Sequence, residues 1–476
     1  MAIDNEELRA AIRSAIPARL DGPPPPQFIY IPAAHTQAIH PDHALVRGIR
    51  GSGKSVLWWW LQQPWVTESL SALFPAQPVP NRLLVTPGFG ETPDPDMYPG
   101  RDTLTRLLGA FEPRTIWRAI ATYRIGSPLL PSVDTWEARV AWVKSNPEQV
   151  ERALYEADEG FVKANMLGWV LFDALDRTAD SWEDRSRLLS GLLQNLLDFR
   201  GYRAIRLKAF VRPDMLVDPE LRRFPDASKI LNTAVDLRWT RLQLFGLLYH
   251  YLCNEPNQPA VFHDLCEVVL GERPHGDGST FWLASRRLDE QESAQRAMFR
   301  HLAGDWMGKD KRRGDPYSWL PNHLADAHGQ VSPRSFLAAA RQAAEVSSAD
   351  YRDHSTPLHF EAIKRGVQNA SQIRVREVEE DFPWLAEVMK PLRELSVPCA
   401  LEDIASAWGA ARLDKTLDRE LRGVQPRRSG EFAPGLLEQL IDIGVFSRLA
   451  DERINMPDVY RVGFGLKRRG GVRPVR

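Results

Sequence analysis

The sequence predicts an α/β fold, a parallel sheet with helices on both faces, followed by a helical lid and a C-terminal winged-helix-like region. Short segments at 44–47, 82–86, 168–172 and 205–211 are predicted as strands, and helical patterns separate them. The run at 168–172 is apolar throughout, which is typical of a strand buried on both faces of a parallel sheet. After about residue 235 the strand signal fades, and the pattern indicates helices at 238–252, 262–270, 293–302 and 333–346.

We expect four parts along the chain. Residues 1–43 would form an N-terminal helix and a Pro-rich lead-in, because four prolines at 23–26 end the helical pattern of residues 5–20. Residues 44–235 would form the α/β core, with a helical insertion at about 92–160. Residues 236–346 would form the helical lid. Residues 347–476 would form a helical and winged-helix-like region that ends in a basic tail.

Composition narrows the class of protein. The 476 residues include 61 Lys and Arg against 62 Asp and Glu, so net charge gives no general attraction to nucleic acid or membrane. Three cysteines, Cys253, Cys266 and Cys399, cannot build a disulfide framework and suit a reducing compartment. The N-terminus has acidic residues where a signal peptide needs basic ones, and no apolar run is long enough to span a bilayer. We therefore expect a cytoplasmic protein without membrane association.

The loop after the first predicted strand matches the pattern G-x-x-x-x-G-K-[ST] at every fixed position. Its residues are Gly48, Ile49, Arg50, Gly51, Ser52, Gly53, Lys54 and Ser55. Glycines let backbone N–H groups surround phosphate oxygens, and the following helix directs its positive end at the anion. Lys54 is expected to reach the β- and γ-phosphates, and Ser55 to give its hydroxyl to Mg²⁺. The loop predicts a P-loop nucleoside-triphosphatase core; with no guanine-reading Asn-Lys-x-Asp motif, ATP is favoured over GTP.

A second acidic motif follows the strand at 168–172. This strand delivers Asp173 to the carboxyl edge of the sheet, where ligands bind and a carboxylate can hold the hydration shell of Mg²⁺. Many ATPases place a glutamate directly after this aspartate to polarise water, but here that residue is Ala174 and the next acid is Asp176. We expect Asp173 to serve the metal and catalysis, and Asp176 to be catalytic or to position water. Turn capping for Asp173 and helix capping for Asp176 are the alternatives.

These residues resemble a known group of ATPases. A small residue after the strand aspartate and an acid three positions beyond it resemble the NACHT-like branch of the STAND signal-transduction ATPases, although Arg177 replaces the final acid of that pattern. Residues 210–214, Phe-Val-Arg-Pro-Asp, look like the STAND strand end that carries a γ-phosphate-sensing arginine, which implies Arg212. Residues 332–336, Ser-Pro-Arg-Ser-Phe, are similar to the second sensor of AAA+ and origin-recognition-type ATPases, which implies Arg334.

The resemblance covers roughly residues 40–340 and implies an ATP-driven molecular switch. ATP and Mg²⁺ would bind between core and lid, the two arginines would sense the γ-phosphate, and hydrolysis would reset the state. Bacterial members of these groups include many signalling and antiviral defence ATPases. Since the chain shows no recognisable effector or repeat domain, the resemblance implies a protein effector in trans. A nucleotide-dependent homo-oligomer is also in keeping with it.

Other classes remain open on the sequence. The main alternative is an ATPase that remodels DNA through its C-terminal region, where 433–449 is predicted as a helix and turn and 453–456 and 459–464 as wing strands. The basic residues that follow could contact a phosphate backbone, a docking partner or only solvent. A small-molecule kinase would need an acceptor motif, and none is evident. His250 with Cys253 and His263 with Cys266 have zinc-like spacing, but they lie in apolar helices where core packing is favoured.

Overall fold

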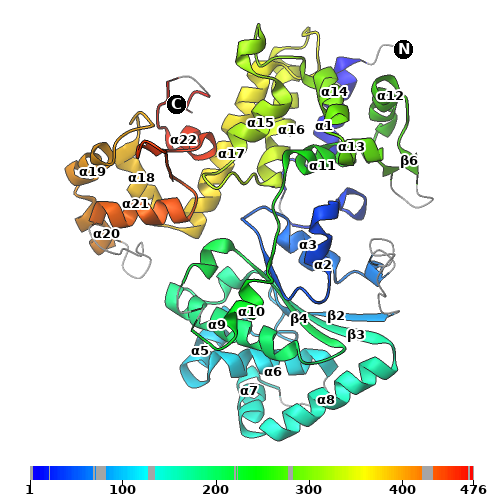
Figure 1. The fold of residues 1–476 in the computed structure, drawn as a ribbon, viewed down its shortest axis with the longest axis vertical. Helices are drawn as coiled ribbons and strands as arrows, with labels where there is room; N and C mark the ends of the chain where they lie inside the picture. The colour runs from blue at the N-terminus through cyan, green and yellow to red at the C-terminus, as the bar shows by residue number, and fades with distance from the viewer. Residues whose placement is uncertain are drawn as a thin grey trace. The chain divides into compact units, whose positions relative to one another are not determined.

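A computed structural model describes residues 4–20, 22–67, 70, 82–126, 134–218, 221, 223–276, 282–420, 432–469 and 472–474. The chain forms two compact units. The core unit comprises Ala33–Ile49 and Gly53–Leu237, and the helical unit comprises Met1–Pro32, Arg50–Ser52 and Arg238–Arg476. Figure 1 labels the elements of both units. Within the described ranges, no helix is both long enough and apolar enough to cross a membrane.

The core unit is built on a five-stranded parallel sheet with the strand order β2-β3-β4-β1-β5. The strands are Leu45–Arg47 (β1), Arg82–Phe89 (β2), Met166–Phe172 (β3), Ile205–Val211 (β4) and Val235–Asp236 (β5). The sequence predicts the first four, while β5 has only two residues and too short a pattern to be found. The predicted fold class, an α/β core with a parallel sheet followed by helical regions, is confirmed.

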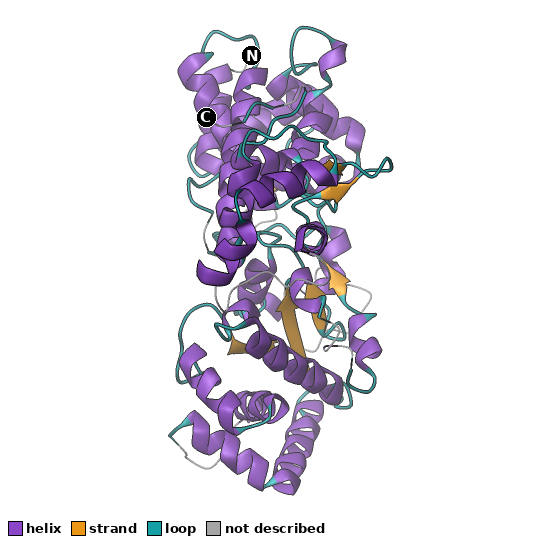
Figure 2. Ribbon diagram, turned by 90° about the vertical axis from the view of Figure 1, so that its left-hand side faces the viewer, coloured by secondary structure: helices purple, strands orange, loops and turns teal. Residues whose placement is uncertain are grey.

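Helices cover this sheet, and Figure 2 shows the strands enclosed among them. They are Thr36–Ile39 (α2), Lys54–Trp60 (α3), Arg101–Ala110 (α5), Pro113–Gly126 (α6), Trp136–Ser145 (α7), Pro147–Lys163 (α8), Trp182–Phe199 (α9) and Ala227–Leu231 (α10). Helices α5 to α8 separate β2 from β3 along the chain, as expected for a helical insertion. Trp117 of α6 packs edge-on against Phe89 and Phe172, at 6.1 and 5.5 Å between ring centroids. The insertion therefore shares one apolar core with the sheet.

A buried lysine ties the segment before β1 to the sheet. Lys208 of β4 is fully buried, and its ammonium donates to the carbonyl oxygens of Ala38 (2.7 Å), His40 (3.0 Å) and His43. Burial lowers the pKa of Lys208 to about 7. Three backbone acceptors take the three donors of an ammonium group, so this contact fixes where the chain enters the strand that leads to the phosphate loop.

The helical unit includes the N-terminal helix as well as the predicted lid. Its first helices are Asn5–Ala15 (α1), Arg241–Cys253 (α11), Pro259–Leu270 (α12), Arg286–Glu290 (α13), Glu292–Ala303 (α14), Pro316–Leu324 (α15), Pro333–Asp350 (α16) and Phe360–Asp381 (α17), with a hairpin of His275–Gly276 (β6) and Trp282–Leu283 (β7). The buried guanidinium of Arg9 donates to the carbonyl oxygens of Arg352 and Pro357, at 2.9 and 2.7 Å. Helix α1 therefore packs into the same apolar core as α11 to α17.

The C-terminal part of the helical unit has an apolar core of its own. It contains Leu385–Met389 (α18), Leu401–Ala410 (α19), Leu413–Glu420 (α20), Phe432–Asp442 (α21), Ser447–Arg448 (β8), Ile454–Asn455 (β9) and Asp458–Phe464 (α22). Strands β8 and β9 form an antiparallel hairpin, and Cys399 adds an antiparallel bridge to Ile454. The C-terminal region is thus helical with one short hairpin, and its winged-helix-like character stays a prediction. The prediction of a second wing strand at 459–464 is wrong, because the buried Val459, Tyr460 and Val462 lie on helix α22.

The described part of the basic tail is packed against the protein. The buried Arg461 donates to Asp458 (2.7 Å) and to the carbonyl oxygens of Leu466 (3.1 Å) and Val472 (2.6 Å). Lys467 pairs with Glu394, and Arg468 lies 3.5 Å from the carboxylate of Asp458. The four predicted parts and their bounds stay predictions, since the chain divides here into two units and three apolar cores.

Candidate nucleotide-binding site

The phosphate loop joins β1 to α3, the strand–loop–helix context that its sequence requires. Gly51 and Gly53 have φ values of 75° and 99°, a left-handed region that glycine adopts without strain. Helix α3 begins at Lys54, and the Lys54 ammonium donates to the carbonyl oxygens of Gly48 (2.8 Å) and Ile49 (3.0 Å). Burial lowers the pKa of Lys54 to about 8, although Asp173 acts in the opposite direction. The lysine is held within the loop that it is predicted to serve.

Asp173 follows β3 and lies with the residues that begin α3. Its side chain is 3% exposed, and its backbone N–H donates to the carbonyl oxygen of Phe89, at 3.0 Å. Burial raises the pKa of Asp173, and hydrogen bonding from Ser55 and the charge of Lys54 only partly offset this. The structure therefore brings Lys54, Ser55 and Asp173 together at the carboxyl edge of the sheet. A hydroxyl and a carboxylate are oxygen ligands of the kind that Mg²⁺ takes in proteins.

Arg212 and Asp176 meet in the core unit. Asp176 lies in a single 3-10 turn, Leu175–Arg177, which follows Ala174 in a left-handed conformation. Arg212 follows β4 and binds Asp214 through two hydrogen bonds of 3.0 and 2.7 Å. Its third nitrogen lies 3.5 Å from the Asp176 carboxylate. Burial alone would raise the pKa of Asp214, but Arg212 outweighs it and the pKa is lowered. Asp214 is a partner that sequence reasoning missed, although it stands two residues after the arginine.

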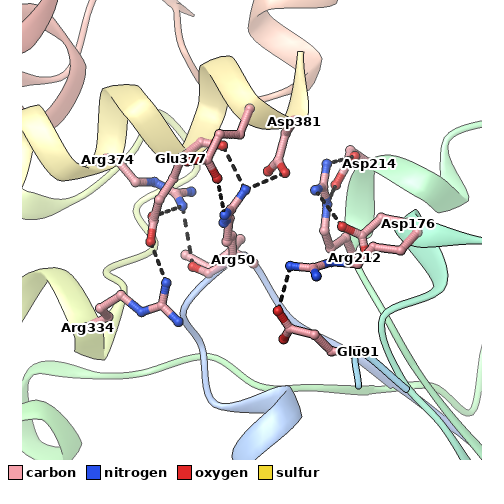
Figure 3. Close-up of polar contacts among 12 residues, drawn as sticks. Arg50, Glu91, Asp176, Arg212, Asp214, Arg334, Arg374, Glu377 and Asp381 are labelled. Atoms are coloured by element: carbon pink, nitrogen blue, oxygen red, sulfur yellow. Dashed lines mark hydrogen bonds and ion pairs between the residues drawn. The ribbon is translucent and has the colours of Figure 1, made fainter. Parts of the chain in front are cut away.

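Arg334 lies in the helical unit, in the first turn of α16, beside a residue of the phosphate loop that belongs to the same unit. Ser332 Oγ donates to the carbonyl oxygen of Gly51, at 3.3 Å. A Cβ on Gly51 would collide with this hydroxyl and lie 3.3 Å from Cβ of Arg334. The Arg334 guanidinium donates to Glu377 at 2.8 Å, and Glu377 also accepts from Arg374 at 3.2 Å. Figure 3 shows Glu377 between these two arginines.

Arg50, also of the phosphate loop and the helical unit, binds the last turn of α17. Its guanidinium donates to the Asp381 carboxylate at 2.7 Å, to the Glu380 carboxylate at 2.5 Å and to the carbonyl oxygen of Glu377 at 3.0 Å. A cation at the carboxyl end of a helix also interacts favourably with the helix dipole. These partners lie more than 300 residues away along the chain, so no local pattern could reveal them.

A further acidic residue stands at the end of β2. Glu91 pairs with Arg177 at 2.7 Å, and both side chains are more than half exposed. Figure 3 shows Glu91 with its guanidinium partner. Gly90, the preceding residue, approaches α3 so closely that a Cβ there would lie 2.7 Å from the ring of Trp58. Sequence reasoning missed Glu91 because its strand carries no motif.

The two predicted zinc-like pairs are packed in the core. His263 Nε2 lies 2.9 Å from the carbonyl oxygen of Cys253, and the His263 ring packs edge-on against Trp282. Burial raises the pKa of the Cys253 thiol, which contacts Cys266. Across the residues that the structure describes, no group of three or more His, Cys, Asp and Glu side chains could hold a metal ion. Core packing, the favoured interpretation, agrees with this geometry.

No protein-family model matches the chain, and no curated protein matches it. The chain is similar to the solved structure of the Aeropyrum pernix ORC2 protein in ADPNP–ADP complexes, with 13% identity over 91% of this chain and 93% of that chain, at a TM-score of 0.38.

Proposed function

We propose that this chain binds ATP with Mg²⁺, hydrolyses it, and uses the cycle as a molecular switch of the STAND/AAA+ kind. One observation carries the proposal. A complete phosphate loop stands between a parallel strand and a helix, and Lys54 and Ser55 of that loop meet Asp173 from a second strand. Lys54 binds the β- and γ-phosphates, while Ser55 and Asp173 hold Mg²⁺ and its water shell. The metal neutralises charge that develops on the phosphates during hydrolysis.

The switch rests on arginines whose charge a γ-phosphate can engage. Arg212 and Arg334 are each held by carboxylates, so a phosphate must compete with Asp176 and Asp214 in one case and with Glu377 in the other. ATP carries the γ-phosphate and ADP does not, so only ATP shifts these pairs. We propose that the resulting change is passed to a protein effector in trans, in a signalling or defence role, and that self-association follows the nucleotide state. Asp176 is predicted to be catalytic or to position water; it lies 3.5 Å from Arg212, and we propose that it acts at the site beside that arginine.

Nucleotide binding by a Lys54→Ala variant tests the proposal. The variant loses a charge-assisted contact to phosphate, and we expect ATP affinity to fall at least about 100-fold. Lys229→Ala is a matched control, because Lys229 is an exposed lysine of the same unit, and its ammonium forms a surface ion pair with Asp226. Equilibrium binding of a fluorescent ATP analogue, with ATP and GTP as competitors, measures affinity and base preference. ATP affinity that is unchanged in Lys54→Ala would refute the proposal.

DNA binding through the winged-helix-like part is a second candidate function, and the hairpin β8–β9 is the observation that favours it. Against it, Lys467 and Arg468 of the tail already have acidic partners. An Arg448→Ala, Arg453→Ala variant removes cations from the hairpin and the turn between its strands without touching the tail that Arg461 anchors. If DNA is a ligand, binding to duplex DNA across a salt series will show a shallower salt dependence in this variant.

A further inference from the structure

The residue that directly follows the strand aspartate cannot assist the attack of water. In-line hydrolysis requires a group that orients the attacking water and accepts its proton. The residue after the strand aspartate is Ala174, whose methyl group can do neither. The candidates for this role are the acids that follow neighbouring strands at the carboxyl edge of the sheet. In the part of the chain that the structure describes, they are Glu91 after β2, Asp176 after β3 and Asp214 after β4.

The strand register places Glu91 beside the missing position. Strands β2 and β3 are parallel neighbours, and Phe89 is paired with Phe172 at their ends. The Asp173 N–H donates to the Phe89 carbonyl oxygen, so the two chains leave the sheet side by side. Glu91 is two residues beyond Phe89, as Ala174 is two residues beyond Phe172. The position after β3 that lacks a carboxylate, Ala174, thus has a carboxylate at the equivalent position after β2, Glu91.

The turn that carries Glu91 is also fixed against the helix that begins at Lys54. Gly90 lies against the Trp58 ring, and Trp58 donates from Nε1 to the carbonyl oxygen of Leu171, at 3.4 Å. Trp58 stands one helical turn after Lys54 and Ser55. The position of Glu91 is therefore set by β3 and α3, which are the elements that carry Asp173 and the phosphate-loop residues.

Asp214 already accepts two hydrogen bonds from Arg212, and the ion pairs of the other two acids, Asp176 and Glu91, distinguish their roles. Asp176 contributes to the network around Arg212, whose side chain is 9% exposed, and removing an acid from such a network leaves a buried charge poorly compensated. Glu91 is 59% exposed and Arg177 is 52% exposed, and a pair of this kind stabilises by at most about 1 kcal/mol. Glu91 is therefore the carboxylate that can leave its partner easily and turn toward a water molecule.

We infer that Glu91 is the catalytic base of the proposed ATPase, an inference that rests on the proposed function. The attacking water forms a bond from its oxygen to the γ-phosphorus, and the bond from that phosphorus to the β–γ bridging oxygen breaks. The water proton passes to the Glu91 carboxylate and then to solvent, and ADP and phosphate are the products. Arg177 is a positioning residue that holds the carboxylate at the end of β2 between turnovers.

Single-turnover hydrolysis and ATP binding in a Glu91→Gln variant test this inference. Glutamine keeps the size of the side chain but cannot accept the proton, so we expect the hydrolysis rate to fall at least about 100-fold. ATP affinity should stay within about threefold of the wild type, because Glu91 contacts water rather than nucleotide. Glu183→Gln, an exposed glutamate in the first turn of α9, is the matched control and should hydrolyse normally.

Two further results decide between explanations. Arg177→Ala breaks the same ion pair but leaves the carboxylate, so its rate should change less than about tenfold. An equal loss in Arg177→Ala and Glu91→Gln would show that the pair matters rather than the base, and would overturn the inference. Turnover that survives Glu91→Gln in a chain that binds ATP would overturn the inference alone. A wild-type chain that binds no ATP would overturn the proposed function and this inference with it.

Discussion

Arg212 and Arg334, the two arginines predicted to sense the γ-phosphate, are held differently in their units. Arg212 in the core unit has a side chain that is 9% exposed, and it binds both oxygens of Asp214 with Asp176 beside it. Arg334 in the helical unit has a side chain that is 31% exposed, and it has one ion pair, with a Glu377 that also serves Arg374. The core arginine is thus fixed by two carboxylates of its own, while the helical one shares a single carboxylate.

This difference indicates which of the two arginines responds more readily to a γ-phosphate. A planar guanidinium that makes two parallel hydrogen bonds to one carboxylate is oriented as well as neutralised. Arg212 is therefore held in one orientation at the edge of the sheet, and separating it from Asp214 costs two charge-assisted hydrogen bonds. Arg334 can exchange one carboxylate for a phosphate at a lower cost, because Glu377 keeps Arg374 as a partner. We expect both arginines to respond to the γ-phosphate, Arg334 more readily than Arg212, and Arg212 to contribute more to stability.

The largest expected effect is that of Arg212→Met on stability. Methionine preserves much of the aliphatic volume but leaves Asp214 and Asp176 without their cation, and breaking a buried pair lowers the free energy of unfolding by about 3 kcal/mol. Urea denaturation measures this, with the exposed Arg200→Met as control. A loss under about 1 kcal/mol would show that the core pair is no stronger than a surface one, and the comparison with Arg334 would fail.

The ion pair between Arg212 and Asp214 should also make the stability of the wild type depend on pH. Arg212 lowers the pKa of Asp214 below its unfolded value, so this carboxylate stabilises the fold above about pH 4 and that contribution is lost as pH falls through the lowered pKa. In Arg212→Met this part of the acid dependence should disappear.

Much of the core could be predicted because its signals are local. The phosphate loop is contiguous, and Asp173 directly follows an apolar run, so both can be found by reading along the chain. The partners of the site residues could not be predicted in the same way. Glu91 meets Arg177 through strand pairing, and Glu377 meets Arg334 across 43 residues through the packing of α16 on α17. The pattern of a single element carries no information about either contact.

The C-terminal part shows the same limit. The sequence predicts a helix and turn at 433–449, and helix α21 ends at Asp442 within that range. The segment at 459–464 is short and mostly apolar, so its sequence suggests a strand as readily as a helix. Its helical conformation is set by tertiary contacts, since Ser371 of α17 accepts from Gly463 N–H at 2.8 Å and donates to the Val459 carbonyl oxygen at 2.7 Å.

Glu377→Gln should have the next largest effect and should act on nucleotide discrimination. Glutamine still accepts a hydrogen bond but carries no charge, so Arg334 and Arg374 lose their shared anion, and stability falls by about 2 kcal/mol. The freed Arg334 should then favour ATP over ADP by several-fold more than in the wild type. Competition between ATP and ADP for one fluorescent nucleotide gives the ratio. If the ratio is the same in both proteins, Arg334 does not sense the γ-phosphate.

Asp173→Asn should change the free energy of unfolding of the core unit in the opposite direction to Arg212→Met. Burial raises the pKa of Asp173, so its charged form destabilises the fold at neutral pH, and that penalty is relieved as pH falls through the raised pKa. Asparagine removes the penalty and should raise the free energy of unfolding by about 1 kcal/mol at pH 7, while Mg²⁺-dependent turnover is lost. Thermal unfolding at pH 7 and pH 4 measures both parts. A variant less stable than the wild type at pH 7 would show that Asp173 is a structural acid.

The smallest expected effect separates the two carboxylates that hold Arg50. Asp381 is 11% exposed and Glu380 is 63% exposed, although both accept from the same guanidinium. Water screens an exposed pair, so Glu380→Gln should change stability by less than about 0.5 kcal/mol, and only at low salt. Asp381→Asn should lower it by about 1 kcal/mol and persist at high salt. Urea denaturation of both variants at two salt concentrations provides the measurement. Equal effects of the two substitutions would mean that the charge of the helix end, rather than one buried contact, holds Arg50 in place.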